Sequence, residues 1–506
     1  MSDMQQRVVA FLIEALAREL GASVETINTH ISRIFLAGDR AFKLKRAVKL
    51  PYADFSTPEL RYAACRREVE LNRLTAPDLY LGVRRIILDT DGQLSFNGDG
   101  ELVDAIVEMR RFDQAQIMDR MADAGQLTPQ LMADTASMIA RFHENAPIVR
   151  AGTGTSNLVD VLDINRASFD RTNLFISAEV DALDHQLRTS LFRHADVLNR
   201  REEAGKVRRC HGDLHLRNIC VFEGRPLLFD CIEFNEQLAT VDVLYDLAFL
   251  LMDLTHRGHV DLANLVANRY FDETDNENGF ALLPFLMAIR ASVRAHVTAT
   301  QAEEAGDPSG ELSQRARSYF DLARSQLAVL SPRLIAIGGL SGSGKTVIAE
   351  ALAPRIGVAP GARIIESDRI RKALHGVPAE TRLPPEAYRP EVSERVYGEM
   401  ARRAETILEG SAPVVADAVF QRPENRERIE HAMRKRKLPF LGVWLDVPED
   451  VLKERVRQRQ GGPSDATVDV LARQMMVDTG DITWHRVNAA RQPEAIIADI
   501  LSLQAP

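Results

Sequence analysis

Cysteine is scarce in this chain of 506 residues. There are four, and they are Cys65, Cys210, Cys220 and Cys231. So few thiols argue against a disulfide framework, and we expect a reducing, cytoplasmic compartment. Three of them lie near His211 and His215, but no Cys-x-x-Cys pair is present. We therefore interpret them as small packing residues rather than zinc ligands.

Long apolar runs are also missing. No stretch reaches the ~18 apolar residues of a membrane span, and the longest run, residues 279–289, is typical of a core helix. The N-terminus lacks the basic segment and cleavage site of a signal peptide, and residues 8–20 have the spacing of an amphipathic helix. We expect no membrane partner.

An excess of positive charge is absent too. The net charge is −9 and the pI is about 5.8, which gives no support to nucleic-acid binding driven by overall charge. The 45% apolar and 27% charged residues are those of an ordinary soluble protein. The length exceeds what one hydrophobic core serves, so two or three domains are expected.

The first two thirds of the chain predict a mixed α+β fold. A small sheet with one inserted helix is expected over about residues 25–110. Its elements are a strand pair in 31–44, a helix at 58–74 capped by Thr57, and strands at 82–88 and 105–109. Helices follow at 128–199 and 241–327, separated by a hairpin over 219–229, and 301–310 is predicted as a loop.

The last third predicts an α/β fold. Ser331-Pro332 is the expected domain joint. Strands are predicted at 334–337, 363–365, 414–416 and 440–445, and helices at 346–353, 369–374, 393–408 and 424–436. Strands that alternate with helices imply a parallel sheet covered on both faces.

The first motif is His211-Gly-Asp-Leu-His-Leu-Arg-Asn218, followed by a hairpin that ends at Asp230. It keeps the H-x-D-x-x-x-x-N spacing of a kinase catalytic loop. In that arrangement Asp213 accepts the proton of a substrate hydroxyl, while Asn218 and Asp230 hold Mg²⁺ on the phosphates of ATP.

This motif, with Phe229-Asp230-Cys-Ile-Glu-Phe234, resembles the aminoglycoside phosphotransferase family of the kinase-like superfamily. The glycine after His211 and the absence of Asp-Phe-Gly separate it from protein kinases. The resemblance implies a bilobal protein-kinase-like domain over residues 1–328, with lobes at about 1–110 and 111–328.

The same resemblance implies a lysine for the ATP phosphates and a helix glutamate that holds it. Lys43 and Lys45 lie on one face of a predicted strand, so the pattern does not separate them. We assign Lys43, which follows an apolar pair, and we assign Glu68 as its partner, with Glu70 as the alternative.

The second motif is Gly339-Leu-Ser-Gly-Ser-Gly-Lys-Thr346, between an apolar strand and a helix. This is the P-loop pattern in the context that it requires. Its backbone N–H groups and the helix N-terminus bind phosphates, Lys345 reaches the β and γ phosphates, and Thr346 ligates Mg²⁺. The predicted nucleotide-binding residues are Gly339, Ser341, Gly342, Ser343, Gly344, Lys345 and Thr346.

Further charged residues indicate which class of P-loop protein this is. The strand at 414–416 ends in Asp417 without a following glutamate, which counts against a motor ATPase. Asp368 can face a substrate hydroxyl, and Arg371 can orient the acceptor. Arg455 and Arg459, on a late helix, can close over the phosphates as a lid.

This combination resembles the small P-loop kinases, a group with gluconate kinase, polynucleotide 5′-kinase, zeta toxin and chloramphenicol phosphotransferase. The resemblance implies a P-loop kinase domain over residues 333–506. The two-domain layout also resembles uncharacterised bacterial proteins that join a phosphotransferase domain to an ATP-binding domain.

The predicted function is a cytoplasmic, bifunctional, ATP- and Mg²⁺-dependent kinase that phosphorylates hydroxyls of small polar metabolites. One alternative makes the P-loop domain a nucleotide-sensing regulator of the first kinase. Another makes it a nucleic-acid 5′-hydroxyl kinase, which the acidic pI disfavours. The acceptors and the oligomeric state are not indicated by the sequence.

Overall fold

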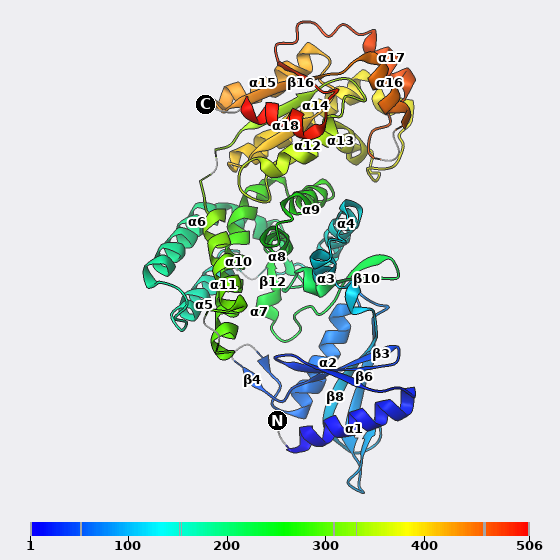
Figure 1. Ribbon diagram of the computed structural model, residues 1–506, viewed down its shortest axis with the longest axis vertical. Coiled ribbons are helices and arrows are strands. Elements are labelled where there is room, and N and C mark those ends of the chain that lie inside the picture. Colours follow the sequence, from blue (N-terminus) through cyan, green and yellow to red (C-terminus); the bar gives the residue numbers. More distant parts are fainter. Residues whose placement is uncertain are drawn as a thin grey trace. The chain divides into compact units, whose positions relative to one another are not determined.

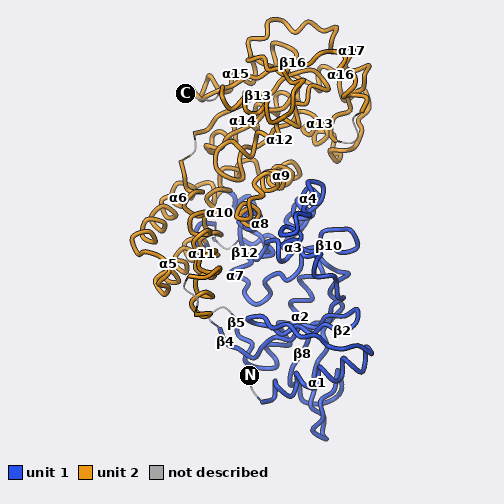
Figure 2. The backbone as a smooth tube through the Cα atoms, in the orientation of Figure 1, with its two compact units in different colours: residues 1–157, 201–250 blue, residues 158–200, 251–506 orange. Residues whose placement is uncertain are grey.

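The computed structural model describes residues 3–50, 53–150, 152, 154–306, 309–329, 331–458 and 462–503. The chain divides into two compact units (Figure 2). The first contains Met1–Asn157 and Arg201–Leu250, and the second contains Leu158–Arg200 and Leu251–Pro506. The predicted boundary at 328–333 separates the regions that carry the two motifs, and it remains a prediction.

The first unit begins with a six-stranded antiparallel sheet in the order β1-β2-β3-β8-β6-β7 (Figure 1). Its strands are β1 (Glu25–Asn28), β2 (Ser32–Ala37), β3 (Arg40–Lys45), β6 (Tyr80–Leu88), β7 (Leu94–Phe96) and β8 (Glu101–Arg110). The small sheet predicted over about 25–110 is therefore present. A separate two-stranded pair is made by β4 (Lys49–Leu50) and β5 (Ala53–Asp54).

Two helices pack on this sheet because its strands alternate their side chains between two faces. α1 (Asp3–Leu20) buries an apolar stripe that includes Leu12 against Phe42 of β3. α2 (Pro58–Asn72) packs Cys65 against Val107 of β8. Thr57 caps α2 as predicted, since its hydroxyl accepts the N–H of Leu60 at 3.3 Å. Lys43, next to Phe42 in β3, points toward the α2 side, where it pairs with that helix.

The rest of the first unit carries the first motif. Its elements are η1 (Gln114–Gln116), α3 (Met118–Asp123), α4 (Pro129–Asn145), β9 (Val207–Arg209), η2 (Leu216–Asn218), β10 (Ile219–Phe222), β11 (Arg225–Leu228), α7 (Glu236–Ala239), β12 (Thr240–Asp242) and α8 (Val243–His256), whose last residues belong to the second unit. β10 and β11 form the predicted hairpin. β9 and β12 pair antiparallel beside the motif.

The helical part of the second unit contains α5 (Ser156–Phe169), α6 (Ser177–Glu203), α9 (Val260–Asp272), η3 (Glu277–Leu282), α10 (Leu283–Glu304) and α11 (Glu311–Gln326). The loop predicted at 301–310 is wrong at its start, because α10 continues to Glu304. One helical stretch, 277–304, is long and apolar enough to cross a membrane by length and composition. Its most apolar window is 72% buried, as in a core helix.

A five-stranded parallel sheet forms the last part of the second unit, in the order β14-β15-β13-β16-β17. The strands are β13 (Leu334–Gly338), β14 (Arg363–Glu366), β15 (Val414–Asp417), β16 (Phe440–Asp446) and β17 (His485–Asn488). The helices are α12 (Lys345–Leu352), α13 (Ser367–Leu374), α14 (Pro390–Glu409), α15 (Pro423–Arg436), α16 (Glu449–Gln458), α17 (Val468–Met475) and α18 (Pro493–Ser502), with η4 (Ala353–Arg355) and η5 (Pro385–Tyr388). Four of the strands were predicted and β17 was not.

The edge strand β14 of this sheet is covered by side chains of α9. Asn268 accepts the backbone N–H of Ile364 at 2.7 Å through Oδ1. Asn264 donates to the carbonyls of Pro360 and Ala362 at 2.7 and 3.0 Å. These amides satisfy backbone groups that an open sheet edge leaves unpaired.

Candidate active sites

The first motif forms a compact loop between β9 and β10. The Asn218 side-chain amide donates to both a carboxylate oxygen and the backbone carbonyl of Asp213, each at 2.9 Å. Asn218 is buried, whereas the side chain of Asp213 is 41% exposed. The Asn218 amide therefore fixes the position of Asp213, while the Asp213 carboxylate stays partly exposed to solvent.

Asp246, in the first turn of α8, accepts hydrogen bonds from the backbone of this loop. Its two carboxylate oxygens accept the N–H groups of His211 at 3.1 Å and of Gly212 at 2.8 Å. Gly212 has φ +84°, and a Cβ there would lie 3.0 Å from Ile232, so the turn requires glycine. Asp246 thus supports the loop rather than facing a substrate.

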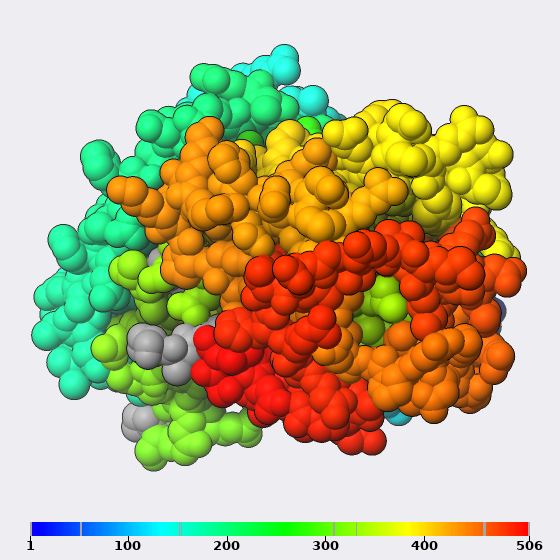
Figure 3. All heavy atoms as spheres, turned by 90° about the horizontal axis from the view of Figure 1, so that it is seen from above, coloured from blue at the N-terminus to red at the C-terminus, as the bar shows by residue number. Residues whose placement is uncertain are grey.

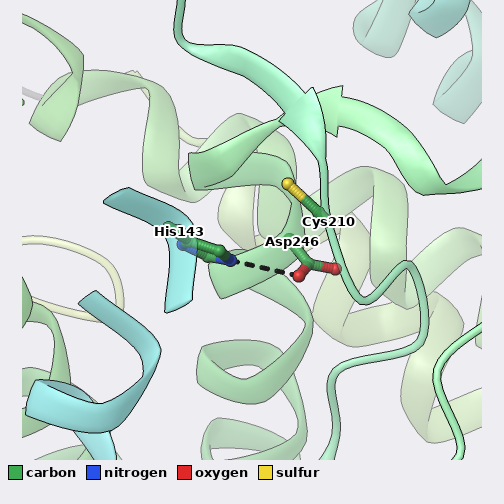
Figure 4. A group of neighbouring side chains, drawn as sticks. All are labelled: His143, Cys210 and Asp246. Carbon is green, nitrogen blue, oxygen red and sulfur yellow. Dashed lines mark hydrogen bonds and ion pairs between the residues drawn. The ribbon is translucent and has the colours of Figure 1, made fainter. Parts of the chain in front are cut away.

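His143 and Cys210 complete a buried group with Asp246, with donor atoms within 4.8 Å of one another. His143 Nε2 lies 3.2 Å from an Asp246 oxygen (Figure 4). Burial raises the pKa of the Cys210 thiol well above its usual range, and its sulfur contacts the Val241 carbonyl at 3.6 Å. This cysteine packs as a small buried side chain and donates a weak hydrogen bond.

Two lysines and three acids lie across β3, α2 and the segment after β11. Lys43 Nζ donates to Glu68 at 2.9 Å and also contacts Asp230. Lys45 contacts Glu68 and Glu233. The Lys45 side chain is fully buried, that of Lys43 is 11% exposed and that of Asp230 is 43% exposed. Of the two lysines, Lys43 therefore faces the open side of the site.

The alternative helix glutamate lies elsewhere. Glu70 is exposed and pairs with Arg67 on the surface of α2 at 3.1 Å. Glu233 was not singled out by the sequence, although one signal existed. Two lysines on one face of a buried strand require more than one counter-ion, and Glu233 lies three residues after Asp230.

The ionisation of this cluster follows from burial and charge together. Burial alone would raise the pKa of Glu68, but the ammonium groups of Lys43 and Lys45 lower it to about 2. For Glu233, burial outweighs the attraction of Lys45 and raises the pKa. Burial on its own would lower the pKa of Lys43, but the negative groups around it, chiefly Asp230 and Glu68, together raise that pKa well above its usual range. The cluster thus holds a charged lysine at the open edge, where phosphates would bind.

The P-loop connects β13 to α12 in the conformation that phosphate binding requires. Gly339, Gly342 and Gly344 have φ of +148°, +87° and +91°. A Cβ on Gly339 would lie 2.7 Å from the Ser343 hydroxyl, and one on Gly342 would lie 2.8 Å from a backbone carbonyl. The glycines of the motif are thus needed for the turn itself.

Polar contacts position the remaining P-loop residues. The Ser341 N–H donates to the side chain of Gln474 at 3.0 Å, and Lys345 Nζ donates to the Leu340 carbonyl at 3.2 Å. Thr346 donates its hydroxyl to Asp417 at 2.7 Å. Asp417 ends β15, the strand beside β13, so the sheet order brings these two oxygen ligands together.

Asp417 is buried under the P-loop. Burial raises its pKa to about 6, although the Lys345 ammonium and the Thr346 hydroxyl act in the opposite direction. The hydroxyl of Thr346 and the carboxylate of Asp417 are hard oxygen donors of the kind that Mg²⁺ prefers. The residues present therefore fit a magnesium ion beside the phosphates.

A cavity of about 810 Å³ lies next to the P-loop, in the second unit. The two predicted acceptor-site residues, Asp368 and Arg371, line it together with Ser341 of the P-loop. The other charged lining residues are Arg382, Glu391, Glu394, Arg422, Glu424, Arg428, Asp465 and Arg473. C-terminal residues, orange to red in Figure 3, also surround a hollow on the face shown there.

Arg371 is held firmly at this cavity. One guanidinium nitrogen donates to the Ala387 carbonyl at 2.7 Å, and the group stacks over the Tyr388 ring at 4.8 Å from its centroid. Its Nε is buried without a partner among the described residues. A buried arginine with a spare donor is suited to an oxygen of an acceptor.

Of the two arginines predicted to form a lid, the described residues include only Arg455. Arg455 donates to the Ala489 carbonyl at 3.1 Å, and its guanidinium lies 3.8 Å from where a Cβ of Gly344 would be. It therefore lies beside the P-loop. Arg459 falls outside the described residues.

Two protein families match this chain. Residues 38–283 match the phosphotransferase enzyme family, and residues 334–478 match an AAA domain. An uncharacterized protein of Mycobacterium tuberculosis is 29% identical over 483 residues, which is 92% of each chain. The predicted pairing of a kinase-like α+β domain with a P-loop α/β domain is confirmed, and the chain is an ATP-dependent kinase.

Solved structures of lower similarity cover each part. A choline/ethanolamine kinase family protein from Mesorhizobium loti is 14% identical, with a TM-score of 0.42, over 64% of this chain and 94% of that one. A gluconokinase from Sinorhizobium meliloti is 24% identical, with a TM-score of 0.25, over 34% of this chain and 91% of that one.

Proposed function

We propose that the chain is bifunctional and that each site transfers the γ-phosphoryl group of ATP to a hydroxyl of a small polar metabolite. The observation that carries the proposal is shared by both sites. Each presents an accessible carboxylate, Asp213 or Asp368, beside groups that suit phosphates and magnesium. Catalysis of phosphoryl transfer is mostly this kind of positioning and charge stabilisation.

In the first site, Asp213 accepts the proton of the acceptor hydroxyl as the oxygen attacks phosphorus. Asn218 and Asp230 would hold Mg²⁺ through an amide and a carboxylate oxygen, and the ion would supply positive charge that neutralises the phosphates. Lys43, held by Glu68, directs its ammonium group at the phosphates.

In the second site, the backbone N–H groups of Gly339–Thr346 and the Lys345 ammonium bind the phosphates. Thr346 and Asp417, which are hydrogen-bonded to each other, would hold the magnesium ion. Asp368 takes the proton of the acceptor hydroxyl, and Arg371 orients the acceptor. Arg455, which lies beside the P-loop, neutralises the transferring charge, and the same role is proposed for Arg459 from the sequence alone.

The size and charge of the cavity support a small polar acceptor. Its volume of about 810 Å³ lies within the roughly 300–1,000 Å³ of sites for small molecules. Its lining combines arginines with acids, which suits a hydroxylated compound better than a polyanionic strand. Four buried free cysteines fit the proposed cytoplasmic location.

The test incubates wild-type, Asp213→Ala and Lys345→Ala proteins with labelled ATP and a metabolite extract, and identifies products by mass spectrometry. We expect each variant to lose a phosphorylated species that the wild type makes. If Lys345→Ala loses none, the second site is not a kinase of these metabolites. If Asp213→Ala still gives every phosphorylated species that the wild type makes, the first site is not a kinase of these metabolites.

A nucleotide-sensing role for the P-loop domain makes a different prediction. Lys345→Ala would then alter the ATP affinity of the first site, whereas two independent kinases leave it unchanged. The accessible Asp368 and the acceptor cavity favour the kinase, since a sensor needs neither.

A further inference from the structure

A buried set of charges joins α9 to the P-loop fold within the second unit. Arg363, the first residue of β14, is 1% exposed. It bonds Asp272 at 2.8 Å and Glu277 at 2.8 and 3.1 Å, and it donates to Asn268 at 3.0 Å. α9 lies inside the phosphotransferase-family match and β14 inside the AAA match. A buried contact thus joins the segment that matches the phosphotransferase family to the segment that matches the AAA domain.

This group of buried charges continues from Asp272 to α13, the helix that carries Asp368 and Arg371. Arg369 Nε lies 3.5 Å from Asp272 Oδ2 and 3.0 Å from Glu366 Oε2. Glu366 ends β14, and Arg369 lies in the first turn of α13, directly after Asp368. A carboxylate of the kinase-like domain thus holds an arginine next to the proposed base of the other site.

A second branch reaches the helix that follows the P-loop. Arg269 of α9 pairs with Asp272 at 3.3 Å and with Glu350 of α12 at 2.5 Å. α9 therefore contacts both helices that carry site residues, α12 with Lys345 and Thr346, and α13 with Asp368 and Arg371. Asp272 is the residue that the two branches share.

We propose that Asp272 is a positioning residue for the P-loop site, acting through Arg369 on the first turn of α13. The proposal rests on the proposed role of Asp368. Burying several charges to hold two domains together costs desolvation that an apolar contact would not. Their bonds have direction, however, and fix the orientation of one helix against another, which sets where Asp368 points.

Two full-length variants test the proposal, both in an Asp213→Ala background that silences the first site. Asp272→Asn keeps the size of the side chain and removes its charge, and Asp272→Glu restores the charge. The matched control is Asp261→Asn, an exposed acid in the first turn of the same helix. Lys345→Ala in the same background defines the turnover that depends on the P-loop.

The chain contains its own reporter for this site. Its two tryptophans are Trp444 and Trp484, and both lie close to Gly338, the last residue before the P-loop. Tryptophan fluorescence during a titration with Mg·ADP therefore measures binding at the second site and not at the first. Turnover is followed as Lys345-dependent consumption of Mg·ATP in a metabolite extract.

We expect Asp272→Asn to lower this turnover by roughly tenfold to a hundredfold, the cost of a small misplacement at a reacting group. The Mg·ADP dissociation constant should stay within about twofold, because the P-loop itself is unchanged. Asp272→Glu should recover part of the turnover, and Asp261→Asn should match its parent. Equal turnover in Asp272→Asn and Asp261→Asn would overturn the proposal, as would parallel loss of turnover and Mg·ADP binding.

Hydrogen exchange of the backbone amides over 363–374 provides a readout that needs no acceptor. Asp272→Asn should speed exchange there about tenfold, which corresponds to ~1.4 kcal/mol of lost local protection, and leave β16 unchanged. Unchanged exchange would overturn the positioning role. If the parent shows no Lys345-dependent turnover but exchange responds, the proposed function fails and the positioning of α13 stands.

Discussion

Replacing Lys45 by methionine tests whether Lys45 serves the stability of the first site while Lys43 serves its chemistry. Lys45 and Glu68 are fully buried and Glu233 is 3% exposed, so no water compensates for a lost charge. Glu68 keeps Lys43 as a partner at 2.9 Å, but Glu233 loses its main one. Removing one partner of a buried ion pair costs ~3–5 kcal/mol, and we expect a loss of unfolding free energy of that size near neutral pH.

The loss should shrink as the pH falls. The pKa of Glu233 is raised by burial even with Lys45 present, and it rises further without that ammonium group. A group whose pKa is higher in the folded state binds protons on folding, so acid favours the folded variant. Each pH unit over which Glu233 is protonated in the folded variant but ionised in the folded wild type returns ~1.4 kcal/mol of the deficit, so the deficit should be smaller at pH 5.5 than at pH 7.5.

Urea unfolding of the full chain measures this effect when two signals are followed. Far-UV circular dichroism reports the whole protein, whereas tryptophan fluorescence reports only the part that contains Trp444 and Trp484. Lys45→Met should lower the stability seen by circular dichroism and leave the fluorescence transition in place. Lys43→Met, whose partner Asp230 is 43% exposed, should be milder in stability but should abolish first-site transfer. A Lys45→Met deficit that is absent, or that does not change with pH, would refute the reasoning.

Two further outcomes follow from the sites and one from the packing of the P-loop sheet. Asp213→Asn should reduce first-site transfer by roughly 10²–10⁴-fold with intact ATP binding, and an active variant would show that this carboxylate is not the base. Because the pKa of Asp417 is raised to about 6, the carboxylate gains a proton as pH falls through that value, so Mg·ADP affinity measured by tryptophan fluorescence should weaken there; a flat profile would contradict a magnesium-holding role. Gly442→Ala would place a Cβ 2.4 Å from the Trp484 ring, so it should cost ~1–3 kcal/mol of stability in urea unfolding, and an unchanged midpoint would show that the ring can move.

Local patterns in the sequence predicted much of the fold. The Thr57 cap, the β10–β11 hairpin and the strand, loop and helix of the P-loop each depend on neighbouring residues, and each is present in the structure. β17 was missed because only one of its four residues is buried, so it has no apolar alternation to detect.

The site details that the sequence left open depend on contacts between distant segments. Lys43 and Lys45 share a strand face, and only the position of Glu233 and the degree of burial distinguish them. The Thr346–Asp417 contact requires β15 to lie beside β13, which is a matter of strand order rather than of pattern. The assignment of chemical roles to these residues remains a prediction.

The cover that α9 provides for β14 also bears on how the chain is made. Synthesis runs from the N-terminus, and domains fold largely in that order. Asn264 and Asn268 therefore leave the ribosome well before Ile364, whose N–H pairs with Asn268. The residues that cover the strand edge are therefore available when that edge is made. A chain that began after α9 would present that edge without its cover, so the P-loop fold depends on a helix that precedes it in the same polypeptide.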